Sequence, residues 1–298
     1  MITLNYLEFG YIEPPYLTAT EVIYSVVEHA VALEQLGFKR FWLSEHYSPE
    51  FAWFSPEPLL PLIAGSTESI RVGWAGVLLK YHNPITIVNN FKLLSAVFPG
   101  RIDLGIAAAG ITKRFHDRMF DGGDWLEKIP FLQALFNRED IGLFDQPVPF
   151  PPHEAAPPSR WYLGTSERSV DLACREQLNL AISYMHPGSD YKRRDLLRQY
   201  HERFGATEGN PGSSTVLLPF LVSDNPALLA DFRMRYGIFN LPELCGPAIT
   251  VAEGIARVVE ETGAEEITLF SPLVDRSQRL ESVGLLTETI RSLIGVAA

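Results

Sequence analysis

The sequence predicts an α/β fold, a (β/α)8 barrel, from three observations. Short apolar runs alternate with amphipathic helical segments along all 298 residues, as is typical of parallel βα units. Eight such runs in a chain of this length fit a (β/α)8 barrel better than an open doubly wound sheet, although counting alone leaves the open sheet as the alternative. No change of composition marks a linker, so we expect a single domain over residues 1–298.

The strands are predicted from short runs of apolar and β-branched residues between turn signals. The clearest runs are "RIDLGIA" at 101–107 and "EITLF" at 266–270. The full set of expected strands is 2–9, 39–44, 70–79, 101–107, 160–164, 179–184, 214–222 and 266–270.

The helices are predicted from apolar residues at helical spacing and from their start and stop signals. Thr20 is the expected N-cap of the first helix, and Gly37 its stop. The Pro-rich stretch 146–160 must be irregular, because proline continues neither a helix nor a ladder, and we expect an extended loop there between the fourth and fifth strands. The expected helices are 20–36, 57–68, 84–97, 124–136, 167–177, 190–204, 225–236, 250–262 and 276–294.

Composition narrows the functional class. Apolar residues make up 46% of the chain and the net charge is −11, which disfavours nucleic-acid and anionic-membrane partners and fits a small-molecule ligand. The two cysteines, Cys174 and Cys245, lack metal-binding spacing, so we expect no structural zinc and no obligate disulfide. We find no signal peptide and no run of about 18 apolar residues, and we expect a cytoplasmic location.

The common nucleotide and hydrolase motifs are missing. The sequence contains no G-x-G-x-x-G after a strand, no Walker A sequence, no H-E-x-x-H and no G-x-S-x-G. These absences disfavour simple dinucleotide dehydrogenases, P-loop enzymes, zincins and α/β-hydrolases. In a barrel, the active site instead lies at the C-terminal ends of the strands, so the residues that follow each strand are the candidates.

The turn after the strand at 160–164 is a candidate phosphate site. Thr165, Ser166 and Ser169 cluster around a predicted helix start, where unpaired N–H groups and the helix dipole favour an anion. Arg168 can add a charge-assisted contact. The alternative interpretation is ordinary N-capping by Ser166.

The end of the strand at 39–44 carries "EHY" at 45–47, which is unusual after the apolar run Phe41–Leu43. His46 can act as a general acid or base near neutral pH. Neighbouring strand residues point to opposite faces, so Glu45 need not share the face of His46. The alternative is a polar strand end with satisfied hydrogen bonds; His82 and His186 have similar positions and can equally be loop residues.

The strand segment "VGWAGVLL" at 72–79 is rich in small residues. Gly73, Ala75 and Gly76 would let a flat ring lie against the strand, or would let neighbouring strands pack closely. Tyr184 and Trp74 can supply the wall of a site for a planar ligand, with core packing as the alternative.

These segments, in this order, resemble the bacterial luciferase-like family of flavin-dependent monooxygenases. The resemblance covers well over half of the chain, fades over 111–159 and is weak in 205–245. It rests on "NYLEFGYIEPPYLTATEV", "LEQLGFKRFWLSEHY", "STESIRVGWAGVLLKYHNPITIVNNFKLLSAVFPGRIDLGI", "WYLGTSERSVDLACREQLNLAISYM" and "ITVAEGIARVVEETGAEEITLFSP".

The resemblance implies a TIM barrel that binds reduced FMN, activates O2 as a flavin hydroperoxide and oxygenates an organic substrate. By position, His46 matches the catalytic histidine of the family, and Ala75 and Gly76 match a non-prolyl cis peptide under the flavin ring. Thr165, Ser166 and Ser169, with Arg168, match the phosphate-binding turn of the family. Tyr184 stands at the position of a luciferase tryptophan beside the flavin ring.

Departures from the family keep other functions open. Relatives carry an arginine or cysteine after the fourth strand, where this chain has "GIAAAGI" at 105–111; Arg168 or Arg114 would have to substitute. Weak flavin binding would suit a supply of reduced FMN from a separate flavin reductase. The alternatives are a coenzyme F420-dependent hydride-transfer oxidoreductase and a non-catalytic flavin-binding protein. Family precedent implies a homodimer, and the apolar segment 47–60 implies a small, apolar substrate.

Overall fold

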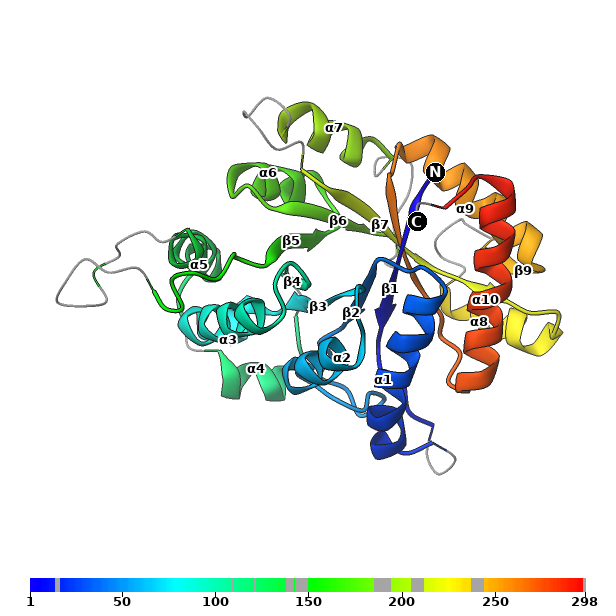
Figure 1. The fold of residues 1–298 in the computed structure, drawn as a ribbon, viewed down its shortest axis with the longest axis horizontal. Helices are drawn as coiled ribbons and strands as arrows, with labels where there is room; N and C mark the ends of the chain where they lie inside the picture. The colour runs from blue at the N-terminus through cyan, green and yellow to red at the C-terminus, as the bar shows by residue number, and fades with distance from the viewer. Residues whose placement is uncertain are drawn as a thin grey trace.

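The computed structural model describes residues 1–13, 17–108, 110–120, 122–137, 142, 150–184, 194–204, 212–236 and 244–296. Eight parallel strands form a closed barrel in the order β1-β10-β7-β6-β5-β4-β3-β2 (Figure 1), which confirms the predicted (β/α)8 barrel. These strands are β1 (Thr3–Glu8), β2 (Arg40–Leu43), β3 (Arg71–Val77), β4 (Ile102–Ala107), β5 (Ser159–Gly164), β6 (Asn179–Ser183), β7 (Ser214–Pro219) and β10 (Glu266–Phe270).

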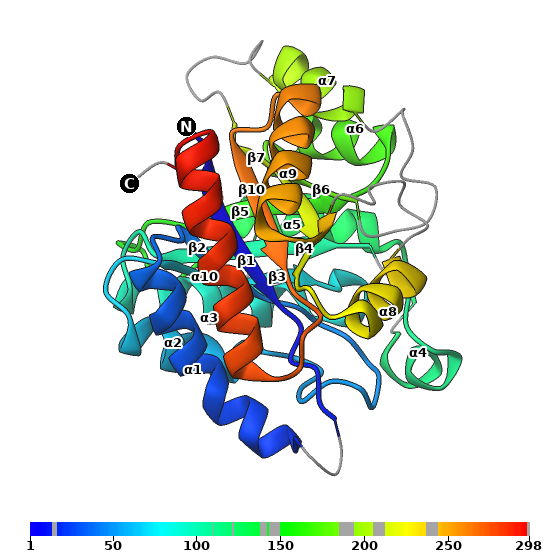
Figure 2. The same cartoon turned by 90° about the vertical axis from the view of Figure 1, so that its right-hand side faces the viewer.

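Helices surround the barrel on the outside (Figures 1 and 2), and all of them except α4 bury apolar side chains. They are α1 (Ala19–Gln35), α2 (Leu60–Ser66), α3 (Pro84–Val97), α4 (Lys113–Met119), α5 (Lys128–Phe136), α6 (Glu167–Arg175), α7 (Arg194–Phe204), α8 (Pro226–Tyr236), α9 (Ala248–Thr262) and α10 (Arg276–Leu293). Three 3-10 turns, η1 (Glu57–Leu59), η2 (Leu79–Tyr81) and η3 (Trp125–Glu127), precede α2, α3 and α5.

Two local predictions are wrong. The N-cap of α1 is Thr18 rather than Thr20, since Glu21 stands three residues after Thr18 and closes a capping box: the Thr18 side chain accepts from Glu21 N, and the Glu21 carboxylate accepts from Thr18 N at 2.8 Å. The expected strand 214–222 is split. β7 ends at Pro219, and β8 (Leu221–Val222) pairs with β9 (Cys245–Gly246) outside the barrel.

Helix α4 was not predicted, because none of its residues is buried and it lacks an apolar stripe. Its aromatic residues pack on the C-terminal side of the barrel instead: the Phe115 ring lies 5.2 Å from that of Tyr47 and 5.4 Å from that of Phe54.

Charged side chains fill the N-terminal end of the barrel interior. Arg40 donates to Asp103 at 2.9 Å and to Glu266 at 3.0 Å, and the Trp42 indole donates to Asp103 at 2.9 Å. Above this network, Leu7, Trp42, Trp161, Ala181 and Leu217 form an apolar layer. The interior is therefore closed at this end, and space for a ligand remains at the C-terminal ends of the strands.

Among the helices within the described ranges, none is both long enough and apolar enough to cross a membrane.

Candidate active site

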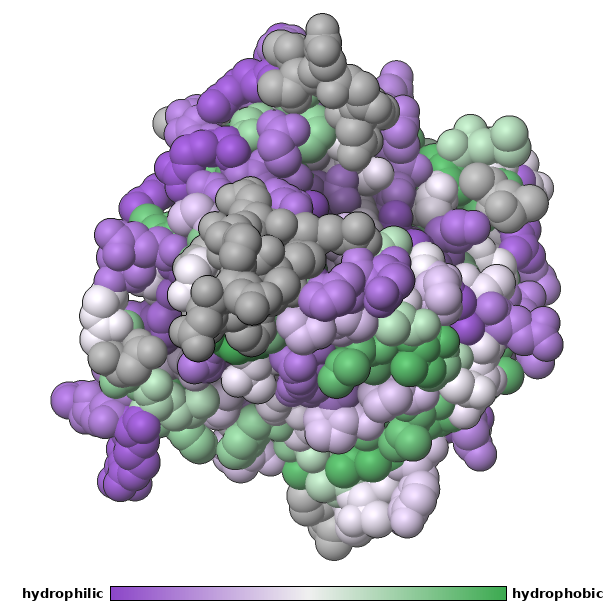
Figure 3. Space-filling view, turned by 60° about the vertical axis from the view of Figure 1, so that its left-hand side comes forward, coloured by the Kyte–Doolittle hydropathy of each residue, from purple (hydrophilic) through white to green (hydrophobic). Residues whose placement is uncertain are grey.

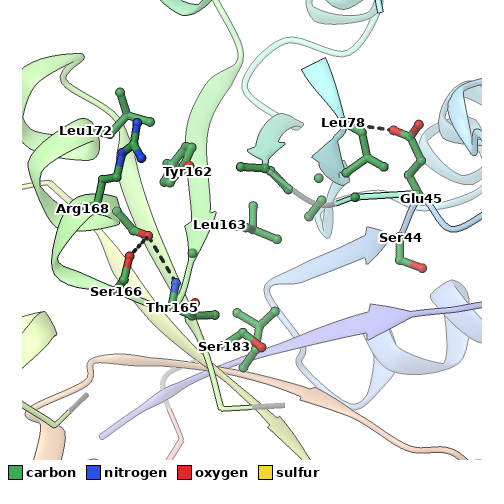
Figure 4. Close-up of a pocket in the computed structure, with 18 of the residues that line it drawn as sticks. Ser44, Glu45, Leu78, Tyr162, Leu163, Thr165, Ser166, Arg168, Leu172 and Ser183 are labelled. Atoms are coloured by element: carbon green, nitrogen blue, oxygen red, sulfur yellow. Dashed lines mark hydrogen bonds between the residues drawn. The ribbon is translucent and has the colours of Figure 1, made fainter. Parts of the chain in front are cut away.

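A cavity of about 990 Å³ lies at the C-terminal ends of the barrel strands (Figure 4). Ligand pockets commonly have volumes of about 300–1,000 Å³, so this cavity is at the large end of the range. Seven of the eight predicted site residues line it: His46, Ala75, Gly76, Thr165, Ser166, Arg168 and Ser169. The structure therefore brings residues that follow β2 and β5 together with the end of β3, although His46 and Thr165 are more than a hundred positions apart in the sequence.

His46 stands on the rim of the cavity, just after β2. Its ring lies 5.0 Å from the rings of both Phe9 and Phe51, and its Nδ1 is 3.1 Å from Ser44 Oγ. The carbonyl oxygen of Ser44 in turn accepts from the Trp53 indole at 3.0 Å. These contacts fix the imidazole between two aromatic rings and direct its Nδ1 edge to Ser44.

Glu45 is buried and braces the neighbouring backbone. Its carboxylate accepts from Leu78 N at 2.9 Å and from the Tyr47 hydroxyl at 2.8 Å, and lies 2.8 Å from His82 Nε2. Burial, with the Glu45 charge in second place, raises the pKa of Tyr47, which therefore remains a hydrogen-bond donor. Glu45 thus ties the end of β2 to the segment after β3, and His82 is part of this brace.

The end of β3 forms one wall of the cavity. The peptide bond between Ala75 and Gly76 is cis, and the register with β4 shifts between Trp74 and Val77. A Cβ atom at Gly76 would lie 3.1 Å from Ala107 N, and one at Gly73 would lie 2.7 Å from Asp103 Cβ. Gly73 therefore serves strand packing, whereas Ala75 and Gly76 both pack against β4 and line the cavity.

The turn between β5 and α6 presents hydroxyl and amide groups to the cavity. Ser169 Oγ accepts from Thr165 N at 3.3 Å and lies 3.3 Å from Ser166 Oγ. Ser166 occupies the N-cap position, but its side chain makes no capping hydrogen bond. The hydroxyls of this turn thus contact each other and do not cap α6. Within the described residues, the backbone amides of Glu167 and Arg168 at the helix start donate no hydrogen bond. Such free N–H groups at a helix start can bind an anion.

Arg168 is exposed on the first turn of α6 and has no carboxylate partner within the described part of the chain. It is therefore available to an anion bound at the turn. Arg114, the other candidate substitute for the missing arginine, lies on α4 outside the cavity lining.

Tyr184 is the predicted site residue that the structure does not bring to the cavity. Its side chain is buried among the core residues outside the barrel, and Ser183, one position earlier, lines the cavity instead. The alternation of strand side chains accounts for this difference, because neighbouring residues of β6 point to opposite faces. His186 falls outside the described residues.

Sequence reasoning missed several cavity residues. Four of them point into the barrel from strands in which every second residue does so: Leu7, Leu163, Ser183 and Leu217. This alternation of strand side chains, counted from Trp42, could have identified them. Glu8, the last residue of β1, points the other way and contacts His29 and Arg279. No group of three or more His, Cys, Asp or Glu side chains suited to a metal ion occurs in the described ranges.

Comparisons with known proteins agree with this geometry. The family model of luciferase-like monooxygenases matches residues 8–238. Two Bacillus subtilis (strain 168) proteins, YwcH and YceB, are 34% and 30% identical over 62% and 66% of this chain, and the matches cover only 58% and 63% of their own length. A luciferase-like monooxygenase of Escherichia coli (strain K12) is 25% identical over 93% of this chain and 94% of its own.

Solved structures share the fold along nearly the whole chain. Apo-MsnO8 has a TM-score of 0.81 at 25% identity and covers 98% of this chain and 99% of its own. The oxygenating constituent of 3,6-diketocamphane monooxygenase from Pseudomonas putida, in complex with FMN, has a TM-score of 0.73 at 16% identity, covering 97% and 98%. An F420-dependent secondary alcohol dehydrogenase reaches 0.70 at 13% identity, covering 97% and 99%. The last two likenesses concern the fold alone.

Proposed function

Because the chain belongs to the luciferase-like monooxygenase family, we propose that it is a flavin-dependent monooxygenase that uses reduced FMN and O2 to oxygenate a small, apolar organic substrate. One observation carries this proposal. A single cavity brings together an imidazole on its rim, a strand wall of small residues and a hydroxyl-rich helix start beside Arg168, which has no carboxylate partner within the described residues.

The described residues fit FMN. The flat wall at Ala75 and Gly76 suits an isoalloxazine ring, and the turn at Thr165–Ser169, with Arg168, suits a phosphate. The remaining space is bordered by Leu7, Phe9, Leu78, Leu163 and Leu217, with two serine hydroxyls, Ser44 and Ser183, at its edge. Such a lining favours an apolar substrate and keeps water away from the reacting atoms.

Bound reduced FMN would supply two electrons to O2, so that one oxygen atom enters the substrate and the other leaves as water. The protein's part is to position the reactants and to move protons. His46 contacts Ser44 through Nδ1, and we assign proton transfer to its imidazole. Glu45 holds the end of β3, and with it the wall at Ala75 and Gly76, in place.

Flavin titration followed by O2 addition tests the proposed function. Protein would be mixed anaerobically with FMNH2 or with reduced F420, and the dissociation constants and the reoxidation rates after O2 is admitted would be compared with those of the free cofactors. We expect FMNH2 to bind and its reaction with O2 to be altered. Preferential binding of F420, its reduction by alcohols, and no effect on FMNH2 oxidation would instead establish hydride transfer.

Replacing His46 by alanine is expected to lower turnover about 10²–10⁴-fold, the contribution usual for a positioned acid–base group. FMN affinity should change by less than about threefold, since the ring lies among Phe9, Phe51 and Ser44 at the rim. Turnover and the FMN dissociation constant would be measured on the same preparation, with His201→Ala on α7 as the control. A collapse of FMN affinity with normal turnover of the bound fraction would refute this role of His46.

Replacing Ser166 by alanine is expected to weaken FMN binding about tenfold, the usual cost of losing one hydrogen bond to a charged group. Riboflavin lacks the phosphate, so its affinity should change little. Fluorescence titration with both ligands measures the difference. Equal weakening of FMN and riboflavin would argue against a phosphate site at this turn.

The segment after β4, "GIAAAGI", lacks a phosphate-binding arginine. Weak flavin binding would suit an enzyme that receives FMNH2 from a separate flavin reductase.

Family precedent also suggests a homodimer. Figure 3 shows hydrophobic areas on the face that it turns to the viewer. Large exposed apolar side chains on consecutive helices α2 and α3 (Leu62, Leu93 and Val97, at 57%, 50% and 67% exposure) support an interface there.

A further inference from the structure

The cavity continues outside the barrel, beyond the turn after β5. On β5, Leu163 faces the barrel interior, whereas Tyr162 lies on the side of the strand toward Arg168 and Leu172 of α6 (Figure 4). We call this extension the outer groove, and the residues that line it are Trp125, Leu126, Tyr162, Arg168, Asp171, Leu172 and Arg175. It is continuous with the turn at Thr165–Ser169, so a ligand whose phosphate lies at the turn can extend into it.

Tyr162 is a mostly buried residue whose hydroxyl remains accessible in the outer groove. Its side chain is 5% exposed and lines the cavity, and within the described residues its hydroxyl forms no hydrogen bond. Burial raises the pKa of this phenol, and the nearby charge of Arg168 acts in the opposite direction. A hydroxyl that lines a cavity without a protein partner is open to a ligand or to water, so Tyr162 is available to a bound polar group.

The charges around the outer groove favour an anion. Arg168 has no carboxylate partner in the described residues, and Arg175 pairs with Glu176 at 2.8 Å. Asp171 is the acidic residue of the lining, and Arg203 on α7 neutralises it at 2.6 Å. Two guanidinium groups and a phenol therefore border the groove in a chain whose net charge is −11.

The other side of the groove is apolar. Trp125 and Leu126 on η3 and Leu172 on α6, which is 5% exposed, all line the groove. Trp125 is partly buried and makes no ring-stacking contact with another described residue. One indole face beside two arginines is suited to a flat, heteroaromatic ring attached to a phosphate.

We infer that the outer groove binds the adenosine monophosphate half of FAD, so that the protein accepts FAD as well as FMN. This inference rests on the proposed flavin function. The phosphate shared with FMN lies at the β5–α6 turn, the second phosphate contacts Arg168, Arg175 and Tyr162, and the adenine packs on Trp125. The cavity volume, about 990 Å³, is large enough for a ligand with such an extension.

Equilibrium binding of FAD, FMN and riboflavin tests the inference without any need for turnover. We expect FAD to bind the wild-type protein at least as tightly as FMN does. Trp125→Leu should weaken FAD about tenfold, in line with the loss of one base–aromatic stack, and Arg175→Gln about fivefold, while FMN changes less than twofold. Arg198→Gln is the matched control, because this exposed arginine lies outside the cavity lining and, within the described residues, pairs with Asp195 and Glu202 on α7.

The outcomes separate this inference from the proposed function. If FMN binds but FAD binds more than tenfold more weakly, the inference is wrong and the flavin function stands. If Trp125→Leu weakens FMN and FAD equally, the adenine does not lie in the outer groove and the inference is wrong. If no flavin binds, the proposed function fails and the inference fails with it.

Discussion

Replacing Gly164 by alanine is expected to weaken FMN binding about ten- to a hundredfold. A Cβ atom at Gly164 would lie 2.1 Å from Ser169 Oγ and 2.4 Å from Ser169 Cβ. Ser169 would have to move, and with it the hydroxyl that accepts from Thr165 N. Overpacking of this kind costs about 1–3 kcal/mol, here at the turn proposed to hold the phosphate. Isothermal titration with FMN and riboflavin measures the effect, which should be confined to FMN.

A second substitution distinguishes the steric explanation from a general loss of folding. The double variant Gly164→Ala/Ser169→Gly removes the Ser169 side chain. It should relieve the clash and restore the melting temperature, but the Ser169 hydroxyl is still missing, so FMN binding should stay weak. Gly284→Ala on α10 is the matched control, because a Cβ atom there meets nothing within 4 Å. If Gly164→Ala binds FMN as tightly as the control does, the turn is not the phosphate site.

Replacing Arg279 by methionine is expected to lower the free energy of unfolding by about 3–5 kcal/mol, with a fall in Tm of roughly 6–15 °C. Arg279 on α10 donates to Glu8 at 3.0 Å, and the two side chains are 6% and 4% exposed. The Glu8 carboxylate also accepts from Gly10 N at 3.0 Å and contacts His29 Nδ1 at 2.8 Å. Without Arg279, the charge of Glu8 stays buried and is poorly compensated.

Two controls check this explanation. Arg235→Met removes an exposed arginine that pairs with Asp231 at 2.9 Å, and should cost no more than about 1 kcal/mol. Glu8→Gln/Arg279→Met should recover part of the lost stability, since it also removes the buried charge. Urea unfolding followed by circular dichroism measures all three variants. A loss for Arg279→Met no larger than that of the exposed control would contradict the role of the pair.

The effect of Arg279→Met should depend on pH. Burial by itself raises the pKa of Glu8, but the charge of Arg279 and the contact with His29 outweigh it and lower this pKa to about 2. A carboxyl with a lowered pKa stabilises the folded state above its unfolded pKa of about 4.3 and loses this contribution as the pH falls towards 2. The difference in stability between wild type and variant should be largest above about pH 4.5 and should shrink below it.

The candidate site was predicted from sequence to different degrees. His46, Ala75, Gly76 and the turn at Thr165–Ser169 lie at strand ends, where the barrel prediction directs attention, and they line one cavity. Tyr184 does not, because a single position along β6 decides whether a side chain points into the barrel or away from it. Within "EHY", His46 and Glu45 both line the cavity, but the structure alone shows that the Glu45 carboxylate is engaged by Leu78 N.

By itself, the sequence determined the alternation of strands and helices, and hence the barrel and the edge of it that carries the site. Local patterns suffice for this, because hydrophobic periodicity and turn residues act over a few positions. Tertiary structure alone decided which side chains meet: the Glu8–Arg279 pair joins residues 271 positions apart, and side chains of η3, β5 and α6 line the outer groove together. Such contacts depend on how elements pack around the closed sheet, which no short stretch of sequence records.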